Sequence, residues 1–196
     1  MAELRMTAET AAELNTKSKS GLGVQDLILI AVLLAAGAVL KLTLASVLSF
    51  AGMKPNFVIA MYCLAIILTK PKTYQAVIIG LLVGLVSQIP LLNATPMVNF
   101  ASEALGGLVC GLLVSGFSKI AADNKGVQNV AFPAVITFIS TVFSGYCFAL
   151  IVGAGINGVP VMAVFGMYAV MVLGTATMNA IAAAILTPVL KAVLKK

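Results

Sequence analysis

Six apolar runs follow one another along the chain, and short polar segments separate them. The runs cover residues of about 24–50, 55–69, 74–92, 96–118, 128–153 and 159–190. A helix needs about 20 residues to cross the hydrocarbon core of a bilayer, and four of the runs satisfy this comfortably. The run at 55–69 covers only about 22 Å as a helix. We therefore expect it to span partly, or to begin below the outer surface after a loop that dips inward over a cavity.

The composition of the chain places these runs in a membrane. The 196 residues are 61% hydrophobic and 9% charged, whereas soluble domains are about half apolar and about a quarter charged. Open sheets leave backbone groups unsatisfied in lipid, and the runs lack the short alternating strands of a barrel. The pattern therefore predicts an all-α integral membrane protein, a six-transmembrane-helix bundle that forms one domain over residues 24–196. Residues 1–23 are polar and predict a flexible cytosolic tail.

The basic residues predict how the bundle is oriented. All but two of the 12 Lys and Arg residues fall in one set of alternate segments: Arg5, Lys17, Lys19, Lys70, Lys72, Lys119, Lys125, Lys191, Lys195 and Lys196. Of the other two, Lys54 lies in the opposite set and Lys41 lies inside the first run. The positive-inside rule then places both termini in the cytoplasm of a multi-pass protein of the cell membrane, with an even number of spans. The same placement argues against nucleic acid as a partner, despite the net charge of +6.

The residue content excludes several classes of chemistry. The chain has no histidine, and Cys63, Cys110 and Cys147 each lie inside an apolar run, where a thiol serves as a small apolar side chain. We therefore predict no metal site, no disulfide and no cofactor. A phosphate-binding loop of the Walker type is missing, and only one carboxylate lies well inside the bundle, so an acid–base pair is missing too. We do not expect an enzyme.

Small residues recur at spacings that let helices approach closely. The pairs are Ala31 and Ala35, Gly80 and Gly84, and Gly107 and Gly111. Such positions favour close backbone packing in a bilayer. We expect the glycine pairs to pack helices inside the bundle. The alanine pair lies in the cytoplasmic half of the first helix and faces either the bundle or a partner chain.

Two charged residues lie deep inside the predicted bundle, where a charge is costly and marks a functional site by default. Lys41 lies roughly 12 Å and Glu103 roughly 10 Å below the outer surface, so the two side chains share a level. They form either a structural ion pair, with Lys41 able to snorkel to the surface, or the two anchors of a zwitterionic ligand. In the second interpretation Glu103 binds an ammonium group, and a lysine binds a carboxylate.

Further polar residues are candidates for the same ligand site. Asn99 lies one turn before Glu103, and small residues continue that helix face and predict room for a ligand. The last run offers a stripe that suits a flat apolar ligand, or that merely packs in the core: Tyr168, Met171, Thr175, Met178 and Asn179. Lys54 and Asn56 lie in the first outer loop and Asn157 in the last one, where they are candidate lid residues.

Several segments of the chain resemble one known family. They are Ala31-Val-Leu-Leu-Ala-Ala-Gly-Ala-Val-Leu40, Gly52-Met-Lys-Pro-Asn56, residues 78–84 and the opening of the fourth run from Pro96 to Glu103. They are similar to the tryptophan transporter family, one of the substrate-binding (S) components of energy-coupling-factor (ECF) transporters. Asn56 and Lys41 stand where the family often has an aspartate and a histidine, so a related aromatic amino acid or another small vitamin-like ligand stays open.

The resemblance implies a division of labour between subunits. This chain would capture its ligand outside the cell, while separate ATPase subunits and a coupling membrane subunit would power import. Ala31 and Ala35 match the alanine motif that contacts the coupling subunit in that family. The sequence therefore predicts a substrate-binding component that imports a small amino-acid-like ligand, with tryptophan preferred. The alternatives are a self-sufficient secondary transporter or facilitator and, third, a small membrane enzyme or scaffold.

Overall fold

The described part of the protein is helical throughout. The computed structural model describes residues 21–47, 55–89, 92, 95–117 and 126–195, with the side chains of 44–47 outside that description. These residues contain no strand and form α2 (Val24–Val47), α3 (Val58–Thr69), α4 (Thr73–Val86), α5 (Val98–Phe117), η1 (Val127–Ala131), α6 (Phe132–Ala149), η2 (Leu150–Ile156) and α7 (Val161–Leu194). The predicted tail at 1–23 lies almost wholly outside the described residues.

Four helical segments are long and apolar enough to cross a membrane. They are Val24–Thr43 of α2, the whole of α5, the continuous segment Val127–Ile156, and α7. α3 and α4 are also apolar but have only 12 and 14 residues. The shortness of α3 agrees with the sequence, whereas α4 is shorter than its apolar run because the chain leaves the helix after Val86 and turns back on itself.

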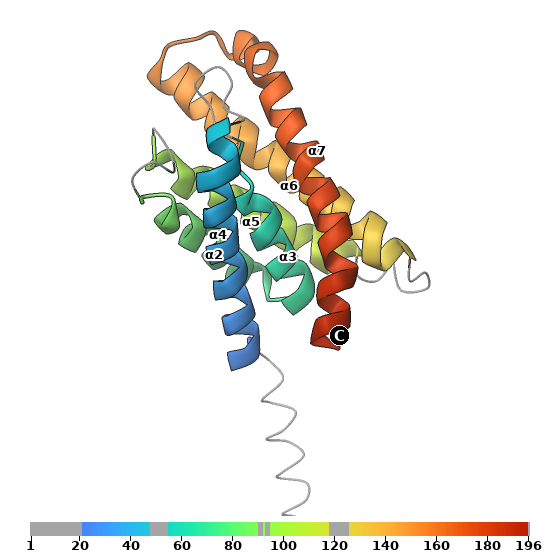
Figure 1. Cartoon of the computed structure of the whole chain (residues 1–196). Coiled ribbons are helices and arrows are strands. Elements are labelled where there is room, and N and C mark those ends of the chain that lie inside the picture. Colours follow the sequence, from blue (N-terminus) through green and yellow to red (C-terminus); the bar gives the residue numbers. More distant parts are fainter. Residues whose placement is uncertain (1–20, 48–54, 90–91, 93–94, 118–125, 196) are drawn as a thin grey trace, which may run out of the picture.

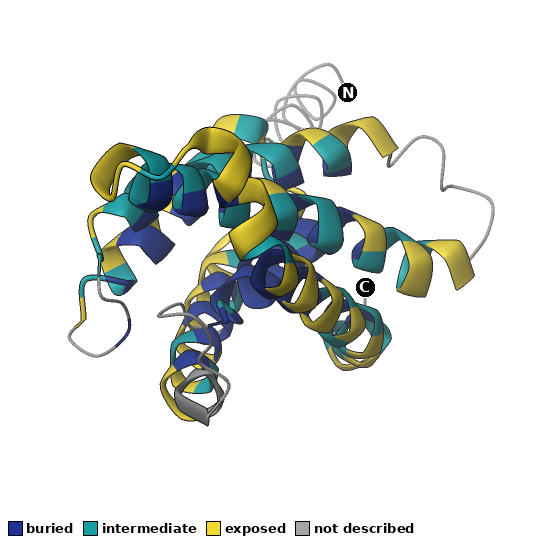
Figure 2. Cartoon of the chain, turned by 90° about the horizontal axis from the view of Figure 1, so that it is seen from above, coloured by how far each residue is buried: buried dark blue, intermediate teal, exposed yellow. Residues whose placement is uncertain are grey.

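The short helix α3 forms the centre of the molecule. Every residue from Val58 to Leu68 is buried, and α3 contacts all five of the other α-helices. Viewed from above, the buried residues gather at the centre and the exposed ones lie on the outside (Figure 2). Because protein covers α3 on all sides, this helix does not have to match the thickness of the lipid.

α2 lies at the edge of the molecule and rests mainly on α3. In Figure 1, α2 and α7 run roughly from top to bottom, and α6 crosses the picture obliquely. Ile30, Leu33 and Leu34 of α2 are buried in the common core with α3. The closest approach is at Gly37, where an added Cβ would come within 3.0 Å of the Val58 Cα. The opposite face of α2 is exposed.

Glycines bring α4 and α5 into direct backbone contact. A Cβ at Gly80 would lie 2.2 Å from the Glu103 carbonyl oxygen, and one at Gly107 would lie 2.5 Å from the Ala76 carbonyl oxygen. Gly84 and Gly111 are equally crowded, against Phe100 and Ala76. The prediction that these glycine pairs pack helices inside the bundle is confirmed. They also fix the backbone of α5 at the position of Glu103.

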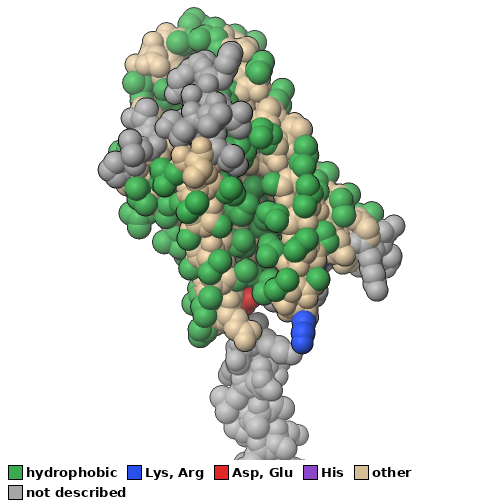
Figure 3. Space-filling model, in the orientation of Figure 1, with side chains coloured by type: hydrophobic (Ala, Val, Ile, Leu, Met, Phe, Trp, Pro, Cys, Tyr) green, Lys and Arg blue, Asp and Glu red, His purple; other side chains and the backbone are tan. Residues whose placement is uncertain are grey.

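The end of the molecule where α7 finishes carries charged residues. Lys191 Nζ donates a hydrogen bond to Asn129 Oδ1 at 2.8 Å, and Lys191 interacts electrostatically with Lys70. The face shown in Figure 3 is mostly hydrophobic, and its acidic and basic side chains appear where α2 begins and α7 ends. The described charges outside the core therefore gather at one end, with apolar surface above them.

Candidate functional site

The centre of the candidate site is a buried carboxylate. Glu103 lies in the first half of α5, and only 1% of its surface is exposed. Asn56 Nδ2 donates a hydrogen bond to Glu103 Oε1, and Ser144 Oγ of α6 donates one to Glu103 Oε2 at 3.4 Å. Donors from two other parts of the chain therefore hold the two carboxylate oxygens, which lowers the cost of burying them.

A buried lysine accompanies this carboxylate. Lys41 of α2 is 2% exposed, and its charge interacts with that of Glu103. The two deep charges that the sequence places at one level are thus brought together from α2 and α5. Lys41 does not snorkel to the surface, because its side chain is enclosed by protein.

Asn56 connects this pair to α6 and α7. It lies just before α3, and its backbone carbonyl accepts a hydrogen bond from Asn179 Nδ2 at 3.0 Å. Asn179 Nδ2 also donates to Thr141 Oγ1 at 3.3 Å, and Thr141 in turn donates to the Thr137 carbonyl at 2.7 Å. We call Lys41, Asn56, Glu103, Thr141, Ser144 and Asn179 the polar cluster. It draws on α2, α5, α6, α7 and the segment that precedes α3.

The small residues below Glu103 do not leave a space. The sequence predicts room for a ligand there, but a Cβ at Gly106 would lie 2.1 Å from the Tyr62 hydroxyl and 3.0 Å from the Ser144 Cβ. Gly107 is filled in the same way by the backbone of α4. That prediction is wrong, because Tyr62 and α4 occupy the volume that the missing side chains free.

Sequence reasoning missed Tyr62 and the hydroxyl groups of α6. Tyr62 is fully buried beside Glu103. A signal for α6 was present, since four hydroxyl residues recur at helical spacing within an apolar run and are all buried: Thr137, Ser140, Thr141 and Ser144. Hydroxyls on one helix face of a membrane protein point to a polar interior.

Other predicted site residues lie apart from the polar cluster or only near it. Asn99 is buried one turn before Glu103, and its side chain donates to the Pro96 carbonyl at 3.2 Å. Thr175 is buried on α7 and donates to Met171 Sδ at 3.7 Å. Asn157 is exposed at the end of η2. Lys54 lies outside the described residues.

The predicted aromatic and methionine stripe on α7 holds only in part. Met171, Thr175 and Asn179 share the buried face of α7. Tyr168 is half-buried, with its ring against Gly153. Met178 is 44% exposed, so its inclusion in the stripe is wrong. The helix turns by about 100° per residue, which sends a residue adjacent to Asn179 to a different face.

Several buried polar atoms of the described residues have no hydrogen-bond partner. They include Asn56 Oδ1, Asn179 Oδ1, Ser102 Oγ, Thr137 Oγ1 and Ser140 Oγ. The two amide oxygens are pure acceptors and belong to the polar cluster. A carboxylate with two further acceptors suits a group with several N–H donors, such as an ammonium. The described residues contain no group of histidine, cysteine and acidic side chains that could hold a metal ion.

A family model described as tryptophan transporter TrpP matches residues 23–195. The chain belongs to this family. The TrpP family is one of the S-component families, so the resemblance seen in the sequence is confirmed. Membership, together with four helices able to cross a bilayer, supports a multi-pass membrane protein of the transporter class. No curated protein and no solved structure matches the chain closely enough to be compared with it.

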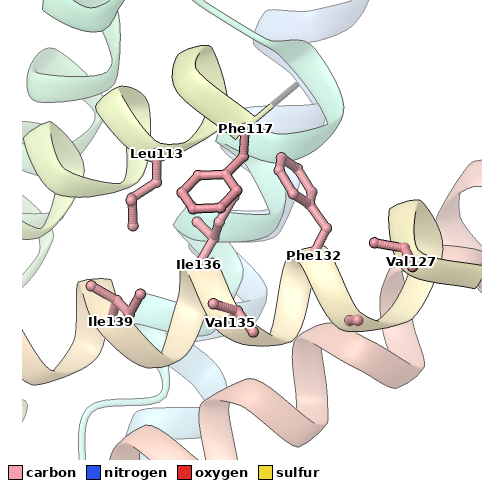
Figure 4. A pocket seen from close by; sticks show the side chains of 8 residues that line it. Leu113, Phe117, Val127, Phe132, Val135, Ile136 and Ile139 are labelled. Atoms are coloured by element: carbon pink, nitrogen blue, oxygen red, sulfur yellow. The ribbon is translucent and has the colours of Figure 1, made fainter. Parts of the chain in front are cut away.

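This TrpP family member also has an apolar groove of about 240 Å³ whose lining contains no residue of the polar cluster (Figure 4). It lies between the end of α5 and the beginning of the next membrane segment, and is lined by Leu113, Phe117, Val127, Ala131, Phe132, Val135, Ile136 and Ile139. The rings of Phe117 and Phe132 lie 6.5 Å apart within it. The lining has no charged side chain, so the groove lacks the groups that would hold the two charged ends of an amino acid.

Proposed function

We propose that this chain is the membrane substrate-binding component of an ECF-type transporter and that it captures tryptophan at the polar cluster. The observation that carries the proposal is the fully buried Glu103, held by Asn56 and Ser144 beside Lys41, in a chain of the tryptophan transporter family. Ionisable groups at membrane depth are retained for function. No other set of described residues combines a buried acid and a buried base.

The chemistry of the cluster suits the two ends of an amino acid. The ligand ammonium would lie against Glu103, with Asn56 Oδ1 as a second acceptor. The ligand carboxylate would lie against a lysine, which is either Lys41 or Lys54. Without ligand, Lys41 and Glu103 balance each other's charge, so the cluster does not hold an uncompensated ion.

Further residues contribute to the ligand site in this proposal. The buried α7 face around Met171 and Thr175 offers a soft, apolar surface for the indole ring, since methionine packs well against aromatic rings. Asn99, Asn157 and Tyr168 are weaker candidates, because no hydrogen bond joins them to Glu103 in the described structure.

In the proposed membrane arrangement all six α-helices cross the bilayer, with both termini in the cytoplasm of the cell. The positive-inside rule supports this orientation, and Lys70 and Lys191 lie at the same end of the molecule. As helices, α3 and α4 are only about 18 and 21 Å long. α3 can still be part of the membrane bundle at this length, because protein surrounds it and it does not have to match the thickness of the lipid. Residues 24–196 form the membrane domain, and 1–23 form a cytosolic tail.

The exposed face of α2 is the proposed contact surface for a partner subunit. Ala31 and Ala35 are both exposed there, next to Ile28 and Val32, which are 58% and 59% exposed. Small side chains flanked by large apolar ones allow a second helix to approach closely. A coupling membrane subunit would bind at this face, and ATPase subunits would energise it.

The partner surface can be tested without disturbing the ligand site. Ala31→Trp adds a large side chain to the exposed face, so we expect unchanged tryptophan binding by the purified protein and loss of tryptophan uptake by cells that contain the partner subunits. Val170→Trp is the control, because Val170 is 74% exposed on α7 and should affect neither. Uptake that survives Ala31→Trp, or uptake by liposomes that contain this chain alone, would favour a self-sufficient transporter.

The ligand site is tested by tryptophan binding to purified protein, measured by calorimetry. A charge-assisted contact contributes about 1.5–3 kcal/mol, so Glu103→Gln should weaken binding by about ten-fold to over a hundred-fold. Asp26→Asn is the matched control, because Asp26 accepts a bond from Gly23 N at the start of α2, remote from the cluster. No binding by the wild type would refute the substrate, and equal binding by Glu103→Gln would refute the site.

A further inference from the structure

The side-chain amide of Asn179 has a fixed orientation. Its Nδ2 donates to the Asn56 carbonyl, which can only accept, and to Thr141 Oγ1. Thr141 uses its own proton on the Thr137 carbonyl, so Thr141 can only accept from Asn179. Turning the amide over would place Oδ1 against two acceptors. The hydrogen-bond chain therefore decides which end of the amide is the oxygen.

This orientation leaves one acceptor with no donor. Asn179 is 0% exposed, and its Oδ1 has no hydrogen-bond partner among the described residues. A buried carbonyl without a donor is unfavourable, and native structures rarely keep one without a water, a ligand or a role. The neighbours one turn away on the buried face are Ala176 and Ala183, which offer no side-chain donor, and Thr175, whose hydroxyl donates to Met171 Sδ.

Asn56 links the side chain of Asn179 to the acid. Its side-chain amide contacts Glu103, and its backbone carbonyl contacts Asn179. One residue and two hydrogen bonds therefore link Glu103 to Asn179, so the acid and the unpaired amide oxygen belong to one connected cluster. A ligand whose ammonium lies on Glu103 would then bind in the same cluster as Asn179.

We propose that Asn179 Oδ1 accepts a hydrogen bond from the indole N–H of the ligand and thereby selects tryptophan over flat aromatic amino acids that lack this donor. The inference rests on the proposed function and deepens it, because it assigns the side-chain selectivity to one residue of the cluster. Phenylalanine and sulfur analogues of tryptophan would leave the oxygen buried and unpaired. A site built around a hydrogen bond rejects an analogue that cannot make it far more strongly than an apolar pocket does.

The test compares tryptophan with 3-(3-benzothienyl)alanine, in which sulfur replaces the N–H and the shape is nearly the same. Binding of both compounds is measured by calorimetry on the full chain. We expect wild type to prefer tryptophan by about 10- to 100-fold, and Asn179→Leu to bind the two compounds about equally. Thr177→Val is the matched control, because Thr177 is exposed on the same helix and donates to the Leu173 carbonyl of that helix, so the preference should persist.

Each other result has a distinct meaning. Equal affinity of wild type for the two compounds, as expected if water alone fills the site, overturns the inference and leaves the proposed function standing. A preference that survives Asn179→Leu overturns it as well. If wild type binds neither compound, the proposed function fails together with the inference. Asn179→Ser, which is too short to reach the same position, should lose the preference too and replaces the leucine variant if that protein does not fold.

Discussion

At the scale of single residues, the candidate site depends on how the buried charges of Glu103 and Lys41 are stabilised inside the bundle. Glu103 and Lys41 are both almost fully enclosed, and each would be costly alone, because the protein interior does not solvate a charge as water does. Asn56 and Ser144 supply hydrogen bonds, and Lys41 supplies the opposite charge. The pair therefore behaves as one unit, in which the loss of one member is worse than the loss of both.

This coupling gives a stability prediction. Lys41→Met should destabilise the protein by about 3–5 kcal/mol, because it leaves Glu103 as an uncompensated buried charge, whereas the double variant Lys41→Met with Glu103→Gln should recover much of the loss. Thermal unfolding of the purified protein in detergent measures both. Additive losses in the double variant would show that the two charges do not interact.

At the scale of helices, glycine contacts place the site. α4 and α5 touch through backbone at Gly80 and Gly107, and the missing side chain of Gly106 leaves room for the Tyr62 hydroxyl. These contacts determine where Glu103 lies relative to α3 and α6. The polar cluster is thus held by close packing around it rather than by its own hydrogen bonds alone.

Two glycine-to-alanine variants separate packing from helix propensity. Gly80→Ala forces a Cβ against the Glu103 carbonyl, so we expect a loss of about 1–3 kcal/mol and weaker tryptophan binding. Gly166→Ala is the control, since nothing lies within 4 Å of that Cβ and alanine favours a helix over glycine by about 0.5–1 kcal/mol. Unfolding temperatures and binding should therefore fall only for Gly80→Ala. A Gly80→Ala protein as stable as wild type would mean that α4 and α5 are not in contact there.

Sequence patterns predicted helices better than they predicted what lies between them. Apolar periodicity and length located all the described α-helices, and residue counts placed Lys41 and Glu103 inside the bundle, where both are buried. The end of α4 at Val86 did not follow, because the residues after it are as apolar as the helix itself. The role of Gly106 was missed because its neighbour Tyr62 comes from α3, a contact between distant segments that no local spacing reveals.

The same limit applies to the polar cluster. Glu103 and Asn179 were named from the sequence because amides and acids are rare in apolar runs. The hydroxyls of α6 were not named, since serine and threonine are common in membrane helices and commonly bond to their own backbone, as Thr141 does. What distinguishes Thr141 is a partner on α7, which only the fold shows.

At the scale of the whole molecule, the account requires one orientation in the membrane. The beginning of α2 and the end of α7 lie at the end that carries the described charges outside the core, and the beginning of α7 lies at the opposite end (Figure 1). Capture for import requires cytoplasmic termini, so that the end of the molecule opposite these charges faces the outside of the cell.

Cysteine labelling tests this orientation. In a Cys147→Ala background, where Cys63 and Cys110 remain fully buried, Val161→Cys should react with a membrane-impermeant thiol reagent in intact cells, because Val161 is 53% exposed at the start of α7. Lys195→Cys should react only after the cells are permeabilised. The opposite pattern of labelling would invert the topology and leave the cluster unable to capture a ligand from outside.

The most direct test of the central claim, that Glu103 holds the ligand ammonium, compares three ligands on two proteins. Binding of tryptophan, tryptamine, which lacks the carboxylate, and indole-3-propionate, which lacks the ammonium, is measured by calorimetry for wild type and Glu103→Gln. The account predicts that Glu103→Gln weakens tryptophan and tryptamine by about ten-fold or more and leaves indole-3-propionate unweakened. An equal loss for all three ligands would contradict it, because the acid would then support the fold of the site without contacting the ammonium.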